Sequence, residues 1–131
     1  MEKYLTKEAV IEINELALSS EGEKSVLHNK GALVCLEIMQ GRFEREQKYE
    51  EKIFKKAAYL LERLCQGHAF LDGNKRTSFV ATIAFLSNNL EGTYKLPQYD
   101  EVVDFLKKIA QGETTFNQIY KWLKSIYMRV D

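Results

Sequence analysis

The chain has 131 residues, 45% of them hydrophobic and 29% charged, which is the balance of an ordinary soluble domain. Lysine plus arginine equals aspartate plus glutamate, 19 of each. This zero net charge argues against a general nucleic-acid or membrane-surface binder, because such proteins usually carry a basic excess. The sequence shows no signal peptide or long apolar run, so we expect a cytoplasmic location. We expect residues 1–131 to form a single domain.

The cysteine and histidine content gives little support for a metal cluster. Cys35 and Cys65 form no C-x-x-C pair, and the two histidines are His28 and His68. This pattern argues against a zinc cluster. Both cysteines lie among apolar residues, so we expect buried, free thiols.

The first third of the chain predicts two helices, because apolar residues recur there at helical spacing. Thr6 can cap the first helix, which should end near Ser19. Its buried side is expected to carry Val10, Ile13, Leu16 and Ala17. Residues 32–39 are apolar almost all round, so they predict a short buried helix closed by Gly41.

Two longer helices should follow a charged surface connection at residues 41–49. The third helix is expected at about residues 50–66, and Gly67 suits its end. Its apolar stripe consists of Ile53, Ala57, Leu60, Leu61 and Leu64. The fourth helix should start near Asn74 and end before Gly92. Its stripe consists of Phe79, Val80, Ile83, Leu86 and Leu90.

The last third of the chain predicts two more helices. After Pro97, the apolar spacing of residues 102–110 predicts a fifth helix that stops at Gly112. Thr115 with Gln118 predicts a capping box for a sixth. The predicted fold class is therefore all-α, a compact bundle of about six helices. The short link between the third and fourth makes them a central antiparallel pair.

The link between these two helices, residues 68–73, precedes a helix N-terminus with free backbone N–H groups and a positive dipole end. Lys75 and Arg76 in the first turn oppose that dipole, at a cost of about 0.3–1 kcal/mol each if exposed. Arg76 lies four residues before Val80 and seven before Ile83, so it should point along the apolar face. Such a cation needs an anion, and either Asp72 or a bound phosphate can supply it.

Each neighbouring residue has a possible role at such a site. Gly73 permits a positive φ, and Asn74 can cap the helix or bind an oxygen ligand. Asp72 can hold Mg²⁺ together with phosphate oxygens. His68 is the candidate general base, because histidine commonly exchanges a proton near neutral pH. Phe70 should anchor the loop in the core.

Every one of these residues also has an ordinary structural explanation. His68 can be a surface or capping group, Asp72 a turn former, and Lys75 a solvated charge. Considered together, the residues predict a phosphate-binding hairpin with a histidine beside it. The residues alone go no further.

Residues 68–76 resemble the motif of the Fic/Doc family, H-x-F-x-D-G-N-x-R. The six specified positions are His68, Phe70, Asp72, Gly73, Asn74 and Arg76. A chance match is expected on the order of once in a hundred million starting points. The resemblance extends over most of the chain in length and helix count. It implies a helical fold and the transfer of part of a nucleotide, or of a related phosphoester, onto a protein hydroxyl.

The resemblance also implies roles for single residues. His68 takes the proton of the hydroxyl, and Asp72 holds Mg²⁺. Gly73, Asn74 and Arg76 cradle the phosphates. Phosphoryl chemistry depends mainly on such positioning and charge neutralisation.

Two positions favour the Doc-like (death-on-curing) branch. The adenylyl-transferring branch usually has a second glycine where this chain has Lys75 and a second arginine where it has Phe79. The Doc branch carries the same N-K-R. It implies a toxin that transfers the γ-phosphate of ATP to a threonine of elongation factor Tu and is neutralised by a small antitoxin protein. No direct nucleic-acid or membrane partner is expected.

Three further segments can be set beside features of the family. Residues 87–92 match an inhibitory signature by letter, but they end the fourth helix, roughly 25 Å from the phosphate site. We interpret that match as coincidence. Glu21-Gly22 lacks the required Ser or Thr, so an inhibitor in trans is implied. Residues 42–48 would correspond to a target-positioning flap, although a solvated loop is the preferred interpretation.

Two other functions stay open. One is a nucleotidyl or other phosphoester transferase of the Fic type. The other is a non-catalytic binding module, in which Lys75 and Arg76 pair with Asp72 or with acidic neighbours.

Overall fold

The structure is a computed structural model of the chain, and it describes residues 1–19 and 24–131. Within these residues the regular elements are helices except for two short strands, so the fold is all-α, as predicted. The elements in chain order are α1 (Lys7–Leu18), η2 (Lys30–Val34), α2 (Cys35–Ile38), η3 (Met39–Gly41), α3 (Tyr49–Gly67), α4 (Asn74–Asn89), β1 (Tyr94–Lys95), α5 (Tyr99–Ala110), α6 (Phe116–Ile126) and β2 (Met128–Arg129). The two strands form a short antiparallel pair.

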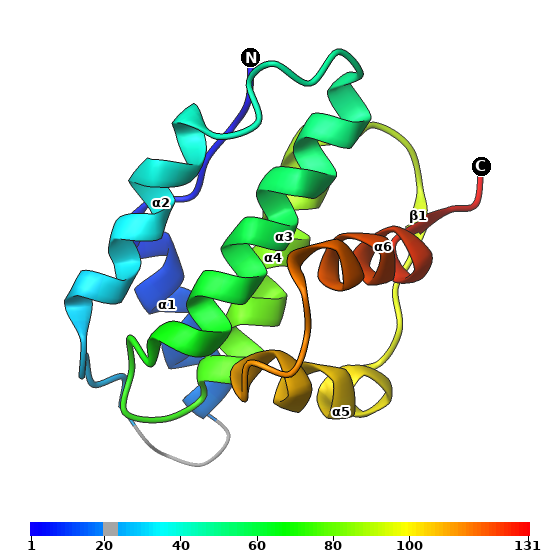
Figure 1. Ribbon diagram of the computed structural model, residues 1–131. Coiled ribbons are helices and arrows are strands. Elements are labelled where there is room, and N and C mark those ends of the chain that lie inside the picture. The colour runs from blue at the N-terminus through cyan, green and yellow to red at the C-terminus, as the bar shows by residue number, and fades with distance from the viewer. Residues whose placement is uncertain (20–23) are drawn as a thin grey trace.

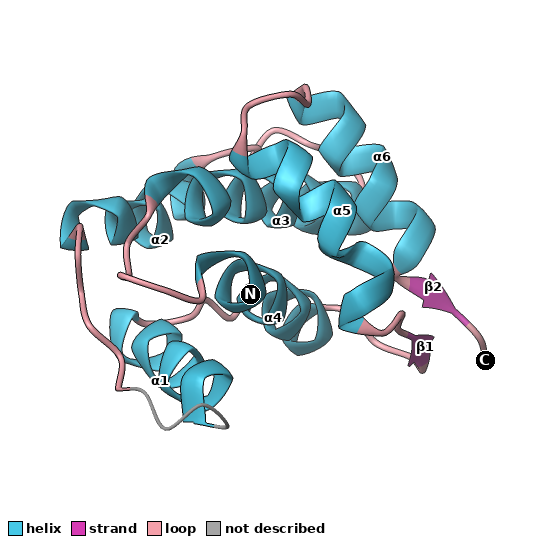
Figure 2. Cartoon of the chain, turned by 90° about the horizontal axis from the view of Figure 1, so that it is seen from below, coloured by secondary structure: helices cyan, strands magenta, loops and turns pink. Residues whose placement is uncertain are grey.

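The antiparallel helices α3 and α4 form the centre of the bundle (Figure 1). Figure 2 shows α4 between α1 on one side and α3 on the other. Helices α5 and α6 pack across α3, so α3 has neighbours on several sides. All five predicted stripe residues of α3 are buried: Ile53, Ala57, Leu60, Leu61 and Leu64. No helix of the described chain is both long and apolar enough to cross a membrane.

Two predicted helix caps agree with the structure. The Thr6 hydroxyl accepts a hydrogen bond from the Ala9 amide at 3.1 Å. Thr115 and Gln118 form the expected capping box of α6. Helix α5 begins at Tyr99, three residues before the predicted apolar spacing, because Gln98 and Glu101 form a second capping box. That box was missed because glutamine is an uncommon cap.

Two predicted buried faces are partly wrong. In α1, Leu16 is 69% exposed, while the polar Asn14 is fully buried. In α4, Val80 is 42% exposed, and three hydroxyl residues are buried, namely Thr77, Ser78 and Thr82. Helix α4 packs between α1 and α3, and hydroxyls can be buried there because they bond to groups nearby. The Thr82 hydroxyl, for example, donates to the Ser78 carbonyl at 2.7 Å. Apolar spacing therefore fails to mark this face.

The segment predicted as one short buried helix is a continuous run of η2, α2 and η3. Leu33, Cys35, Leu36 and Met39 are buried, as expected. Val34 and Ile38 are nearly half exposed, because only one side of the run packs against α3. Cys35 and Cys65 are both free and buried, as predicted.

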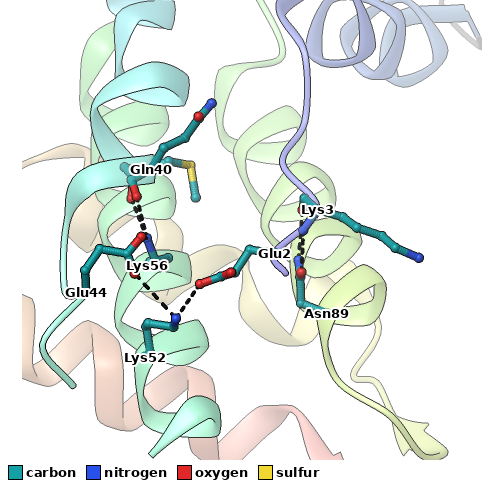
Figure 3. A network of polar contacts seen from close by, with 8 residues as sticks. Glu2, Lys3, Gln40, Glu44, Lys52, Lys56 and Asn89 are labelled. Carbon is teal, nitrogen blue, oxygen red and sulfur yellow. Dashed lines mark hydrogen bonds and ion pairs between the residues drawn. The ribbon is translucent and has the colours of Figure 1, made fainter. Parts of the chain in front are cut away.

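Lys56 is a charged side chain that the fold buries completely, which its sequence position did not predict. Its ammonium donates to the carbonyls of Met39 and Gln40 at 2.9 and 3.0 Å (Figure 3). Glu44 lies 3.4 Å from the same ammonium. The ammonium thus adds a donor at the C-terminal end of η3, where the Met39 carbonyl also accepts from the Arg42 N–H at 3.2 Å.

Replacing Lys56 with methionine should lower the free energy of unfolding by about 1.5–3 kcal/mol. Methionine keeps most of the apolar stem, but it removes the ammonium donor from the carbonyls of Met39 and Gln40, while the Met39 carbonyl keeps the Arg42 N–H. Urea unfolding followed by circular dichroism measures the change. Lys121→Met on the exposed face of α6 is the matched control and should leave stability unchanged. A Lys56→Met protein as stable as the wild type would contradict this account.

Candidate active site

The predicted site loop, residues 68–73, connects the end of α3 to the start of α4. His68 is the C-cap of α3 and has left-handed backbone angles, φ 50° and ψ 49°. The sequence predicts that the helix stops at Gly67, but that glycine is the last helical residue. Steric crowding explains why this helical position is a glycine, since a Cβ on Gly67 would lie 2.7 Å from the Ala32 Cβ. A histidine therefore occupies the backbone conformation that glycine normally takes at a helix end.

The side chain of Phe70 is 2% exposed, as expected of a loop anchor. The Asn74 side chain also holds Phe70, through two hydrogen bonds to its backbone. Its amide oxygen accepts from the Phe70 N–H at 3.0 Å, and its amide nitrogen donates to the Phe70 carbonyl at 2.8 Å. The Asn74 side chain therefore shapes the loop rather than capping α4, which corrects one of the two options considered for it.

Residues 26–29 run beside the loop and bind its backbone. Leu71 N–H donates to the Val26 carbonyl at 2.9 Å, and His28 N–H donates to the Ala69 carbonyl at 2.8 Å. This pairing fixes the path of the loop from outside the two helices. The contact could not be predicted, because residues 24–29 show no strand-like alternation.

Asn14 of α1 connects the loop to three other parts of the chain. Its amide nitrogen donates to the Asp72 carbonyl at 2.9 Å and to the Thr77 hydroxyl at 3.0 Å. Its amide oxygen accepts from the Ser25 hydroxyl at 2.6 Å. Asn14 was not predicted as a site residue. Its place at apolar spacing within α1 could have indicated that this polar side chain is buried.

Gly73 is the N-cap of α4, and its φ of 77° confirms the predicted positive value. A side chain there would also be crowded, because a Cβ would lie 3.1 Å from the Asn14 amide nitrogen. Asp72 is exposed, and one of its carboxylate oxygens accepts from the Gly73 N–H at 2.8 Å. Within the described chain no side chain caps α4. The first-turn amides of this helix are thus available to an anion.

Arg76 does not follow the apolar face, which is a second correction. Val80, one turn further on, is exposed, and the Arg76 guanidinium lies over the Tyr99 ring at 4.3 Å from its centre. Among the described residues, neither Lys75 nor Arg76 forms an ion pair. The pairing with Asp72 that the binding-module alternative requires is therefore not formed there.

A cleft of about 440 Å³ brings the predicted residues together. His68, Asp72, Gly73, Asn74, Lys75 and Arg76 all line it. Phe70 does not, in keeping with its place in the core. The remaining walls come from α1, α3 and α5 and include Leu18, Cys65 and Tyr99, which the sequence analysis did not connect with the site. The volume lies within the range of small-molecule sites.

The cleft offers few protein ligands to a metal ion. No group of three His, Cys, Asp or Glu residues suited to a metal occurs among the described residues. Among the described residues that line the cleft, Asp72 is the one carboxylate. Mg²⁺ usually takes one or two carboxylates and completes its shell with phosphate oxygens and water, so this donor set fits Mg²⁺ carried by a nucleotide.

Cys65 lines the cleft but is not suited to be a nucleophile. It is 1% exposed, and its sulfur lies 3.0 Å from the Ser78 hydroxyl. Burial raises the pKa of the Cys65 thiol to about 11, so the reactive thiolate is scarce near neutral pH.

Three other segments considered in the sequence lie away from the cleft or outside the described residues. Residues 42–48 precede the N-terminal end of α3, whereas His68 follows its C-terminal end, roughly 28 Å away for 19 residues (Figure 1). The preferred interpretation as a surface connection agrees with the structure, and the flap assignment does not. Residues 87–92 likewise lie at the far end of α4. Glu21-Gly22 falls outside the described residues.

Fold and site together define a helical protein in which a histidine-bearing loop lies at a helix N-terminus whose amides are available to an anion. The model of the Fic/DOC family matches residues 4–86, which include the whole loop, and the chain belongs to this family. It is also similar to the protein named "Protein kinase doc" of Escherichia phage P1. The two are 26% identical over 127 residues, covering 95% of this chain and 96% of that protein. These findings confirm the resemblance to the Doc-like branch.

Proposed function

We propose that this protein is a kinase that transfers the γ-phosphate of Mg·ATP to a serine or threonine hydroxyl of another protein. The observation that carries the proposal is the cleft, where His68 and Asp72 lie beside the uncapped N-terminus of α4 with two cations in its first turn. The similarity to a protein named as a kinase over nearly the full length of both chains supports the choice of reaction.

Each residue has a chemical part in this proposal. His68 accepts the proton of the attacking hydroxyl, and Asp72 contributes one ligand to Mg²⁺. The amides of α4 and the charges of Lys75 and Arg76 hold the phosphates. Asn74 contributes through its backbone N–H, since its side chain is bonded to Phe70. The bound Mg²⁺ would neutralise negative charge on the phosphates.

Two residues favour phosphate transfer over nucleotidyl transfer. Lys75 adds a charge where the adenylyl-transferring branch has glycine. Phe79, where that branch has a second arginine, is 6% exposed, packs toward Tyr99 and Trp122, and does not line the cleft. A second arginine that binds the outer phosphates is therefore missing, which leaves the γ-phosphate free to lie next to His68.

A two-label experiment tests this reaction. The protein is incubated with Mg²⁺, elongation factor Tu as the candidate target, and ATP labelled at either the α- or the γ-phosphate. We expect the γ-label to appear on the target and the α-label to remain in solution. Transfer of the α-label would replace the kinase by a nucleotidyltransferase. Transfer of neither label to elongation factor Tu or to the proteins of a bacterial lysate would reject both.

An inhibitor in trans is part of the same proposal. Glu91, the glutamate of the matching inhibitory signature, lies beyond the far end of α4 and cannot reach the cleft. We therefore expect a small antitoxin protein. Expression of this chain should stop bacterial growth, and coexpression of the neighbouring small reading frame should restore it.

A further inference from the structure

The contact between Arg76 and Tyr99 joins the phosphate side of the cleft to a helix distant in sequence. The guanidinium carbon lies 4.3 Å from the centre of the Tyr99 ring. Tyr99 is the first residue of α5, is partly buried and lines the cleft. A long, flexible arginine side chain gains a defined position when a ring face holds it.

The Tyr99 ring belongs to an aromatic cluster that also contains Phe79, Phe105 and Trp122. Phe79 of α4 lies 6.4 Å from both Tyr99 and Trp122, measured between ring centres. Phe105 of α5 stacks on Trp122 of α6 at 4.3 Å. Phe79 therefore supports the ring over which Arg76 lies, and Phe79 in turn packs against Trp122 of α6. Phe79, which stands where the adenylyl-transferring branch has its second arginine, is part of this support.

Tyr99 also leaves the charge of Arg76 available. Burial raises the pKa of the Tyr99 phenol, while the positive charge of Arg76 partly opposes that rise. The phenol is therefore neutral near physiological pH. A carboxylate partner would neutralise the guanidinium, whereas a neutral tyrosine holds it in place and leaves its positive charge available to an anion.

We propose that Tyr99 is a positioning residue that holds the Arg76 guanidinium in place for the phosphates of the nucleotide. This inference rests on the proposed function in one respect, since it takes Arg76 as a phosphate ligand. It adds a residue on α5, outside the loop motif, to the machinery of the cleft.

A double-mutant cycle separates this role from simple packing. Binding of inorganic tripolyphosphate is measured by calorimetry for the wild type, Tyr99→Leu, Arg76→Ala and the double variant. Tyr99→Leu should weaken binding by about two- to fivefold in the wild-type background. It should have no further effect once Arg76 is alanine. Tyr99→Phe keeps the ring face and should bind like the wild type.

Several outcomes would overturn the inference. They are an equal loss in both backgrounds, a Tyr99→Phe variant as weak as Tyr99→Leu, and a wild-type protein that binds no tripolyphosphate. Thermal unfolding checks that the variants are folded. Tyr94→Leu is the matched control, because Tyr94 stacks on Tyr127 and does not line the cleft.

The two-label experiment keeps the inference and the proposed function apart. Coupling of Tyr99 to Arg76 in tripolyphosphate binding without any transfer from ATP would reject the kinase and retain the positioning role. Transfer of the γ-label with unchanged binding in Tyr99→Leu would do the reverse. In an active enzyme, Tyr99→Leu should raise KM for ATP more than it lowers kcat, because it disturbs the position of Arg76 in substrate binding.

Discussion

Replacing His68 with glycine is expected to slow phosphate transfer by about 10²–10⁴-fold while leaving the fold about as stable as before. The first part follows from the proposed role of His68 as the group that takes the proton. The second follows from its left-handed backbone, φ 50°. A residue with a side chain pays about 1–2 kcal/mol in that conformation, and glycine does not. The gain roughly offsets the larger entropy of glycine in the unfolded chain, about 0.4–1 kcal/mol.

Measuring the transfer rate and the stability together distinguishes a catalytic role of His68 from a structural one. Steady-state transfer of γ-label measures the rate, and urea unfolding measures stability. His28→Gln is the matched histidine control, since the His28 side chain is exposed and does not line the cleft, and it should keep the wild-type rate. If His68→Gly kept its activity, another group would have to act as base. If it lost several kcal/mol of stability, His68 would be a structural cap.

Replacing Asn14 with alanine should lower the free energy of unfolding by about 2–4 kcal/mol. The side chain is fully buried, and its removal leaves the Asp72 carbonyl and the hydroxyls of Thr77 and Ser25 without this partner. Because Asn14 donates directly to the loop carbonyl before Gly73, the affinity for Mg·ATP should fall as well. Chemical unfolding and calorimetry measure the two effects.

The donor rather than the shape of Asn14 should matter. Asn14→Asp is nearly isosteric, but it places a carboxylate oxygen against the Asp72 carbonyl, so it should destabilise nearly as much as alanine. Asn117→Ala on the exposed side of α6 is the control and should have little effect. An Asn14→Asp protein with wild-type stability would show that the hydrogen bond to Asp72 contributes little.

Asn14 and Tyr99 act on opposite sides of the same loop. Asn14 holds the backbone at Asp72 from α1, and Tyr99 holds the Arg76 side chain from α5. Both residues lie outside residues 68–76. Affinity for phosphates in this protein should therefore depend on the packing of α1 and α5 against α4 as well as on the loop.

Much of the fold could be predicted because its signals are local. Helix caps such as Thr6 and Thr115 act on amides three residues away, and both were correct. The α3 stripe was also correct, because this central helix buries a face that apolar spacing marks clearly. The α4 face was not, because its buried residues include hydroxyls that bond nearby.

The sequence by itself determined the helices, the site loop and the cluster of His68, Asp72 and the two cations, because these residues are neighbours along the chain and their spacing places them at one helix junction. Only the tertiary structure decided how the loop is held. Asn14 reaches Asp72 across 58 positions, and Tyr99 meets Arg76 from another helix. The buried Lys56 and the left-handed His68 also depend on packing. The arrangement of the helices decides which groups meet in such contacts. The spacing of residues along the sequence does not indicate that arrangement.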